Sequence, residues 1–134
     1  RSGFLCVNIS QMGKNILVIE DDRFLSSLMK ARLEKEGFTA LQAFDGEEAL
    51  NLLKQDKPDL IVMDLIMPKV SGFELLESIS LDPQISKIPV MILSNLGQDS
   101  DIDKVKRLGA VEYFVKVKTS IDDLVSHVKE IANK

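Results

Sequence analysis

Residues 16–22 read ILVIEDD, so four consecutive apolar residues are followed at once by three acids. A short, continuous apolar run rich in β-branched side chains is typical of a strand that is covered on both faces. Similar runs recur as LIVMD (60–64), PVMILS (89–94) and EYFVK (112–116). Each run ends in a polar side chain, so the same strands that build a sheet also predict where its chemistry lies.

Between the predicted strands, the apolar residues change to helical spacing. Helices are predicted over 23–36, 47–55, 73–80, 101–108 and 121–132, and a further strand over 38–44. Gly37 and Gly109 directly follow two of these helices, where glycine commonly terminates a helix. Strands and helices that alternate in this way predict an α/β domain with a five-stranded parallel sheet and helices on both faces.

The composition argues against several classes of protein. The chain has 134 residues, of which 45% are hydrophobic, and this suits one folded domain. Its net charge of -4 argues against binding of nucleic acid through phosphates, and no apolar stretch approaches the ~20 residues of a membrane span. Cys6 is the only cysteine, which favours a reducing, cytoplasmic setting. His127 is the only histidine; we place it on the exposed face of the last helix, and it argues against a His-rich zinc site.

The first residues differ from the rest of the chain. Residues 1–13 read RSGFLCVNISQMG and show neither helical nor strand periodicity. We therefore expect residues 1–13 to be a non-native or flexible leader and residues 14–134 to form the domain.

In a doubly wound sheet, ligands bind at the carboxyl ends of the strands. The polar residues predicted at these ends are Glu20, Asp21, Asp64, Ser94 and Lys116. Clustered carboxylates raise one another's pKa, a cost that a divalent cation removes. Oxygen ligands without His or Cys favour Mg²⁺ over zinc. A carboxylate can also accept a phosphoryl group, whose oxygens Ser94 and Lys116 would stabilise.

Four motifs resemble the receiver domain of response regulators in two-component signalling. They are ILVIEDD (16–22), DLIVMDLIMPKVSG (59–72), VMILSN (90–95) and GAVEYFVK (109–116). The intervals between Asp21, Asp64, Ser94 and Lys116 also fit the family, at 43, 30 and 22 residues. The resemblance implies a flavodoxin-like, three-layer fold with strand order 2-1-3-4-5.

The resemblance assigns an acceptor and a metal site by position. Asp64 would be the phosphoryl acceptor and a metal ligand. Asp21 would bind Mg²⁺ directly and Glu20 would bind it through water. The backbone carbonyl of Ile66 would be the third protein ligand. Asp22 lies outside the usual acidic pair and is interpreted as a helix cap or a surface residue.

The resemblance also assigns the groups that respond to the phosphoryl group. Ser94 matches the family's switch hydroxyl and Lys116 its lysine. Tyr113 matches the aromatic residue that rotates inward on activation. Pro68 and Gly72 match the turn after the acceptor, where they shape the loop into the next helix.

These roles imply a switch and not a conventional enzyme. A sensor histidine kinase or phosphotransfer protein would donate the phosphoryl group, and the domain would promote only its own phosphorylation and slow autodephosphorylation. Phosphorylation would alter the surface that is formed by the fourth helix, the fifth strand and the fifth helix. That surface would signal to a downstream effector protein or domain that is not in this chain, or would pair two copies as a homodimer.

Two positions depart from the family's pattern. Val117 stands where proline usually follows the lysine in a cis peptide bond. We expect a trans Lys116–Val117 bond, because a cis bond before a residue other than proline costs about 2.5–4 kcal/mol. Asn95 stands where a small residue is usual, and we expect it to narrow access to Asp64.

Apolar residues flank the predicted site. Ile66 lies two residues after Asp64, and Leu96 lies two residues after Ser94. Polar residues at these positions can position the water that hydrolyses the phosphoryl group, so we predict a long-lived aspartyl phosphate. Ile66 also argues against a phosphohydrolase with an aspartate nucleophile, which usually has a second Asp there.

Two other classes of protein share this topology or sequence pattern. A flavin-binding domain needs a Ser-, Thr- or Gly-rich phosphate loop after the first strand, where this chain has acids. A degenerate receiver, used for interaction or dimerisation without phosphorylation, remains an alternative because of Val117 and Asn95.

Overall fold

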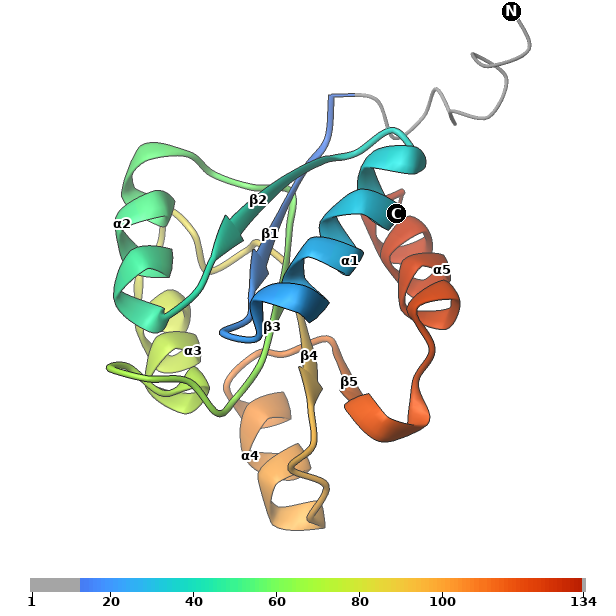
Figure 1. The fold of residues 1–134 in the computed structure, drawn as a ribbon. Helices are drawn as coiled ribbons and strands as arrows, with labels where there is room; N and C mark the ends of the chain where they lie inside the picture. Colours follow the sequence, from blue (N-terminus) through green and yellow to red (C-terminus); the bar gives the residue numbers. More distant parts are fainter. Residues whose placement is uncertain (1–12, 134) are drawn as a thin grey trace, which may run out of the picture.

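The described part of the chain, residues 13–133 of a computed structural model, forms one parallel sheet with the order β2-β1-β3-β4-β5 (Figure 1). The strands are β1 (Asn15–Ile19), β2 (Thr39–Ala43), β3 (Leu60–Met63), β4 (Val90–Ser94) and β5 (Glu112–Val115). The helices are α1 (Arg23–Lys35), α2 (Gly46–Gln55), α3 (Gly72–Leu81), α4 (Asp99–Arg107), α5 (Ile121–Ala132) and the short 3-10 helix η3 (Lys116–Lys118). The predicted α/β fold and strand order are confirmed.

Residues 1–12, with Cys6, and residue 134 lie outside the described residues, so the leader predicted over 1–13 remains a prediction. Within residues 13–133, none of the helices is both long and apolar enough to cross a bilayer.

Alternate side chains of the strands enter two apolar cores, one on each face of the sheet. One core packs under α2, α3 and α4, and its strand residues include Leu17, Ile19, Ile61, Met63 and Ile92. The other packs under α1 and α5, and its strand residues include Ile16, Val18, Leu60, Val62, Met91 and Leu93. Figure 1 shows the two groups of helices on opposite sides of the sheet. Coverage on both faces explains why the strands are continuously apolar.

Local hydrogen bonds define the ends of the helices. Four helices begin at a side chain that accepts a hydrogen bond from the first turn; these are Asp22, Asp45, Ser71 and Ser120. Asp22 accepts from Phe24 N–H and Leu25 N–H at 3.0 and 3.1 Å, which confirms its interpretation as a cap. Gly37 and Gly109 follow α1 and α4 with φ of 105° and 106°, a conformation that glycine adopts at little cost.

The register of the sheet brings the predicted site residues to one edge. Ile19 pairs with Met63, so the residues that follow them, Glu20 and Asp64, leave neighbouring strands at the same level. Ser94 is the last residue of β4 and pairs with Val115 of β5. Lys116 therefore begins η3 directly beside the end of β4.

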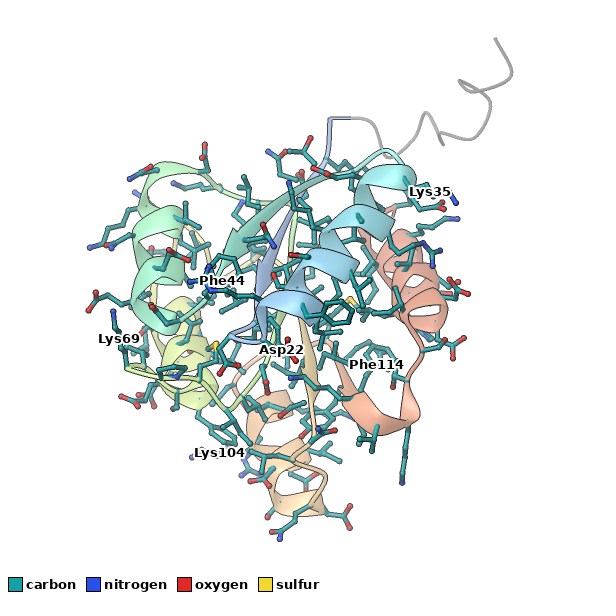
Figure 2. All side chains as sticks on the ribbon, in the orientation of Figure 1. Asp22, Lys35, Phe44, Lys69, Lys104 and Phe114 are labelled. Carbon is teal, nitrogen blue, oxygen red and sulfur yellow. The ribbon has the colours of Figure 1, made fainter. Side chains whose placement is uncertain are left out.

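The predicted and observed elements differ mainly at their ends. Helix α4 begins at Asp99, two residues earlier than predicted, because acidic side chains are favourable at a helix N-terminus. The turn η3 was not predicted, since three residues are too few for a periodic pattern. The prediction for His127 was wrong. Its ring is half-buried and lies 4.7 Å from the ring of Phe114, which faces α5 (Figure 2).

The turn after Asp64 depends on a close backbone approach at Gly72. A Cβ added at Gly72 would lie 2.5 Å from the carbonyl oxygen of Asp64 and 2.5 Å from Cα of Leu65. The N–H of Gly72 donates to the carbonyl of Leu65 at 2.9 Å, and Val70 N–H donates to the carbonyl of Pro68 at 2.9 Å. Helix α3 therefore begins against the backbone of Asp64, in agreement with the predicted role of Gly72 in shaping this loop.

We expect Gly72→Ala to lower the free energy of unfolding by about 1–3 kcal/mol, because the added methyl group meets backbone atoms that cannot move independently. Chemical denaturation of the purified protein measures this change. Gly97→Ala is the matched control, since a Cβ at Gly97 would lie 3.8 Å from Val115 Cγ2, an ordinary contact. Equal stability of the two variants would contradict the close approach at Gly72.

Candidate functional site

Three carboxylates gather at the carboxyl edge of β1 and β3. Glu20, Asp21 and Asp64 each offer an oxygen atom, and these oxygens lie within 4.8 Å of one another. Glu20 and Asp64 are 2% and 5% exposed, whereas Asp21 is exposed to solvent. The structure thus brings together the three acids that were predicted to share a metal site. We call Glu20, Asp21, Asp64 and Lys116 the acidic pocket.

Lys116 supplies the positive charge of this pocket. Its Nζ lies 2.7 Å from Glu20 Oε1 and 2.7 Å from Asp64 Oδ2. The lysine is largely buried as well, so solvent screens these contacts weakly. Two buried carboxylates would repel each other strongly without this ammonium group, which therefore holds them side by side.

The pKa shifts show how the charges balance. Burial raises the pKa of Glu20, against the opposing effect of hydrogen bonds from Lys116 and from Asp22 N–H. Burial by itself lowers the pKa of Lys116, but its hydrogen bonds to Asp64 and Glu20 outweigh this effect and raise it. Lys116 is therefore cationic, while the charge on Glu20 remains costly. A divalent cation beside Glu20 would relieve that cost.

Backbone N–H groups orient the two buried carboxylates. Asp22 N–H donates to Glu20 Oε2 at 3.0 Å. Ile66 N–H donates to Asp64 Oδ1 at 3.2 Å. Each carboxylate therefore bonds Lys116 through one oxygen and a backbone N–H through the other, which fixes its direction.

The donor atoms fit a hard cation. The acidic pocket offers carboxylate oxygens and no sulfur or imidazole nitrogen, a set that suits Mg²⁺ better than zinc. The N–H of Ile66 donates to Asp64, so the backbone that was predicted to supply a carbonyl ligand runs beside this carboxylate. Two observations support a cation at this place: the three acids lie close together, and the pKa of Glu20 is raised.

Ser94 and Tyr113 are held by the loop after β4. Ser94 is fully buried, and its Oγ accepts a hydrogen bond from Leu96 N–H at 3.4 Å. The hydroxyl of Tyr113 donates to the carbonyl of Leu96. Burial raises the pKa of Tyr113, as do the negative charges of Asp101 and Asp64. In residues 13–133 no hydrogen bond joins Ser94 or Tyr113 to the acids, so these two residues lie near the pocket without entering its network.

The two positions that depart from the family's pattern lie together. The described residues contain no cis peptide bond, which confirms the predicted trans Lys116–Val117 bond. Asn95 Oδ1 accepts a hydrogen bond from Val117 N–H at 3.1 Å. From the sequence, Asn95 was expected only to narrow access to Asp64, and this hydrogen bond was not predicted. The pairing of an exposed side chain with a distant backbone group leaves no pattern in the sequence.

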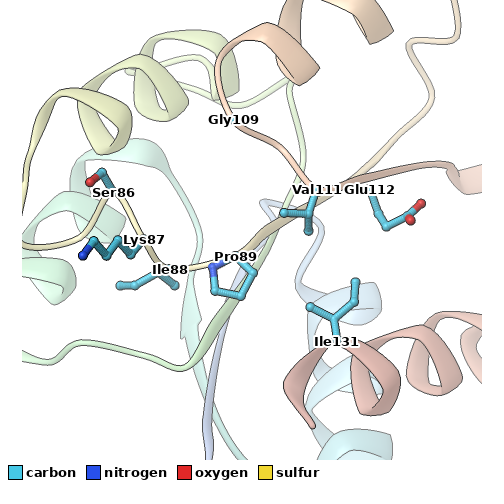
Figure 3. A pocket seen from close by; sticks show the side chains of 8 residues that line it. All are labelled: Ser86, Lys87, Ile88, Pro89, Gly109, Val111, Glu112 and Ile131. Atoms are coloured by element: carbon cyan, nitrogen blue, oxygen red, sulfur yellow. The ribbon is translucent and has the colours of Figure 1, made fainter. Parts of the chain in front are cut away.

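A separate hollow of about 420 Å³ lies near the amino ends of β4 and β5, away from the acidic pocket (Figure 3). It is lined by Ser86, Lys87, Ile88, Pro89, Gly109, Val111, Glu112 and Ile131. Its charged side chains, Lys87 and Glu112, do not converge on one point (Figure 3). None of the predicted site residues lines it.

Several known proteins are similar to this chain in sequence. The sequence profile of the response regulator receiver domain matches residues 16–129. The chain is 38% identical over 119 residues to the transcriptional regulatory protein CpxR of Escherichia coli, covering 89% of this chain and 49% of CpxR. It is 36% identical over 101 residues to Protein PilH of Pseudomonas aeruginosa, covering 75% of this chain and 84% of PilH. The chain spans about half the length, or slightly less, of the transcriptional regulators that it matches.

A solved structure extends the likeness to three dimensions. The receiver domain of the Francisella response regulator 1452 superposes with a TM-score of 0.81 at 32% identity, covering 90% of this chain and 97% of that one. The strand order, the position of the acids and the profile match agree with one another. The chain therefore belongs to the response regulator receiver domain family of two-component signalling.

Proposed function

We propose that Asp64 accepts a phosphoryl group at the acidic pocket, with Mg²⁺, from a sensor histidine kinase or a phosphotransfer protein. The observation that carries this proposal is the contact of one ammonium group, on Lys116, with two buried carboxylates at 2.7 Å each. Receiver domains are not classical enzymes, so the phosphoryl group acts here as a signal.

Each residue of the acidic pocket has its own role in the phosphoryl transfer. The carboxylate of Asp64 attacks phosphorus as the bond from phosphorus to the donor's imidazole nitrogen breaks. Asp21, Asp64 and the carbonyl of Ile66 would hold Mg²⁺ directly and Glu20 would hold it through water, and the ion would neutralise charge on the phosphoryl oxygens. Lys116 moves its hydrogen bond from Asp64 to a phosphoryl oxygen, where its charge stabilises the product.

The output surface follows from the loop after β4. In the proposal, Ser94 leaves Leu96 N–H and donates its hydroxyl to a phosphoryl oxygen. This movement releases the N–H of Leu96, whose carbonyl accepts the hydrogen bond from the hydroxyl of Tyr113. The surface of α4, β5 and α5 then changes and contacts a downstream effector protein or domain, or a second copy of the chain.

Three exposed apolar side chains lie on the edge of the sheet that carries the acidic pocket, and we call them the rim. Phe24 is 74% exposed, Ile66 57% and Val117 78%, and these residues follow β1, β3 and β5 on the same edge of the sheet. Apolar surface rimmed by polar residues commonly marks a protein contact. We propose that the phosphodonor protein docks on this rim, which lies where its phosphohistidine must reach Asp64.

Acetyl phosphate with Mg²⁺ tests the acceptor directly. We expect the intact mass of the wild type to increase by one phosphoryl group, and that of Asp64→Asn to stay unchanged. Asp103→Asn removes an exposed acid of α4 and is the matched control, which we expect to be phosphorylated normally. A mass increase that does not depend on Asp64, or none in the wild type, would favour the alternative of a degenerate receiver that acts only as an interaction or dimerisation module.

The aspartyl phosphate is expected to last for minutes or longer, because the apolar side chain of Ile66 offers no hydrogen bond to an attacking water. We expect Ile66→Asn to shorten the half-life about threefold or more, since one hydrogen bond to the water favours the transition state. The decay of the phosphorylated mass in the presence of Mg²⁺ gives the half-life, and Ile66→Leu serves as the control. Loss of the phosphoryl group from the wild type within seconds would refute this prediction.

A further inference from the structure

The loop after β4 and the turn after β5 are joined by a side chain. Asn95 Oδ1 accepts the N–H of Val117 at 3.1 Å. Asn95 directly follows Ser94, and Val117 directly follows Lys116. The bond thus connects the immediate neighbours of the two residues that would stabilise the phosphoryl group.

Lys116 anchors the start of η3 through its contacts with Glu20 and Asp64, whereas the two residues that follow it are exposed. The side chain of Val117 is 78% exposed and that of Lys118 is exposed, so neither residue anchors the turn by packing. Thr119 closes it locally, with its N–H on the carbonyl of Lys116 at 3.3 Å and its hydroxyl on the carbonyl of Val115 at 2.9 Å. The bond from Val117 to Asn95 reaches out of the turn to the loop after β4, so it adds a link between these two segments beyond the pairing of Ser94 with Val115.

A second bond joins the same two segments from within β5. The hydroxyl of Tyr113 donates to the carbonyl of Leu96. Residues on both sides of Lys116 therefore bond the two residues that follow Ser94. When Ser94 moves, it releases Leu96 N–H and shifts the adjoining Asn95, so the change reaches this loop and, through Val117, the turn of Lys116.

We infer that Asn95 is a positioning residue that couples Ser94 to Lys116, so that the two groups move toward a phosphoryl group on Asp64 together. This inference rests on the proposed phosphorylation of Asp64. It requires an N–H at residue 117, which valine provides and proline lacks. The two departures from the family's pattern, Asn95 and Val117, are thus partners in one hydrogen bond.

A double-mutant cycle tests the coupling. Asn95→Ala removes the acceptor and Val117→Pro removes the donor, while Val117→Ala keeps the donor and is the matched control. We expect each of the first two variants to slow phosphorylation by acetyl phosphate about three- to tenfold, which is the range for one hydrogen bond. Because both remove the same bond, the double variant should be no slower than the slower single variant. Independent effects that multiply would overturn the inference.

Amide hydrogen exchange tests the same hydrogen bond without phosphorylation. It also does not require the protein to accept proline at position 117. We expect the Val117 amide to be protected in the wild type and in Asn95→Asp, which keeps an acceptor oxygen, and to lose about three- to tenfold of its protection in Asn95→Ala. Unchanged protection in Asn95→Ala would overturn the inference. A wild type that takes no phosphoryl group refutes the proposed function, whereas a phosphorylated wild type with independent variant effects refutes only the coupling.

Discussion

The ammonium of Lys116 lies between two buried carboxylates, and the architecture of the carboxyl edge depends on this contact. Glu20 comes from the end of β1, Asp64 from the end of β3 and Lys116 from the end of β5, so one cluster of charges connects three strands. Removing the ammonium would leave two buried carboxylates with no balancing charge, which is costly in a protein interior, whereas removing one carboxylate would leave a balanced ion pair. The pocket is therefore stable enough to form, yet its acids remain ready to take a further cation.

The parts of this arrangement that follow a pattern could be predicted from the sequence. Continuous apolar runs predicted β1, β3 and β4, and parallel pairing then required their polar ends to meet at one edge. The gathering of Glu20, Asp21, Asp64 and Lys116 follows from that geometry. The strand order came from the resemblance and is confirmed by the structure.

The rest depends on contacts between residues distant in sequence, which periodicity does not encode. The packing of His127 on Phe114 and the bond between Asn95 and Val117 are both of this kind. The earlier start of α4 reflects capping and charge at the helix end, where boundaries are least certain in any pattern. Side-chain orientation decides these features, and a single sequence shows residue types but not orientations.

Above all, we propose that the acidic pocket binds a divalent cation, which relieves the cost of its buried carboxylates. This proposal is tested most sharply by measuring how the stabilisation of the protein by Mg²⁺ depends on pH. The raised pKa of Glu20 means that its contribution to stability is present below its unfolded value and is lost as the pH rises through its folded value. Mg²⁺ opposes that loss, so it should raise the free energy of unfolding more at about pH 8 than at about pH 5. At about pH 8, with Mg²⁺ at tenfold the Kd for that pH, the expected gain is about 1.4 kcal/mol. Glu20→Gln should reduce this pH dependence. An equal gain at both pH values, or no gain at either, would contradict a metal site in this pocket.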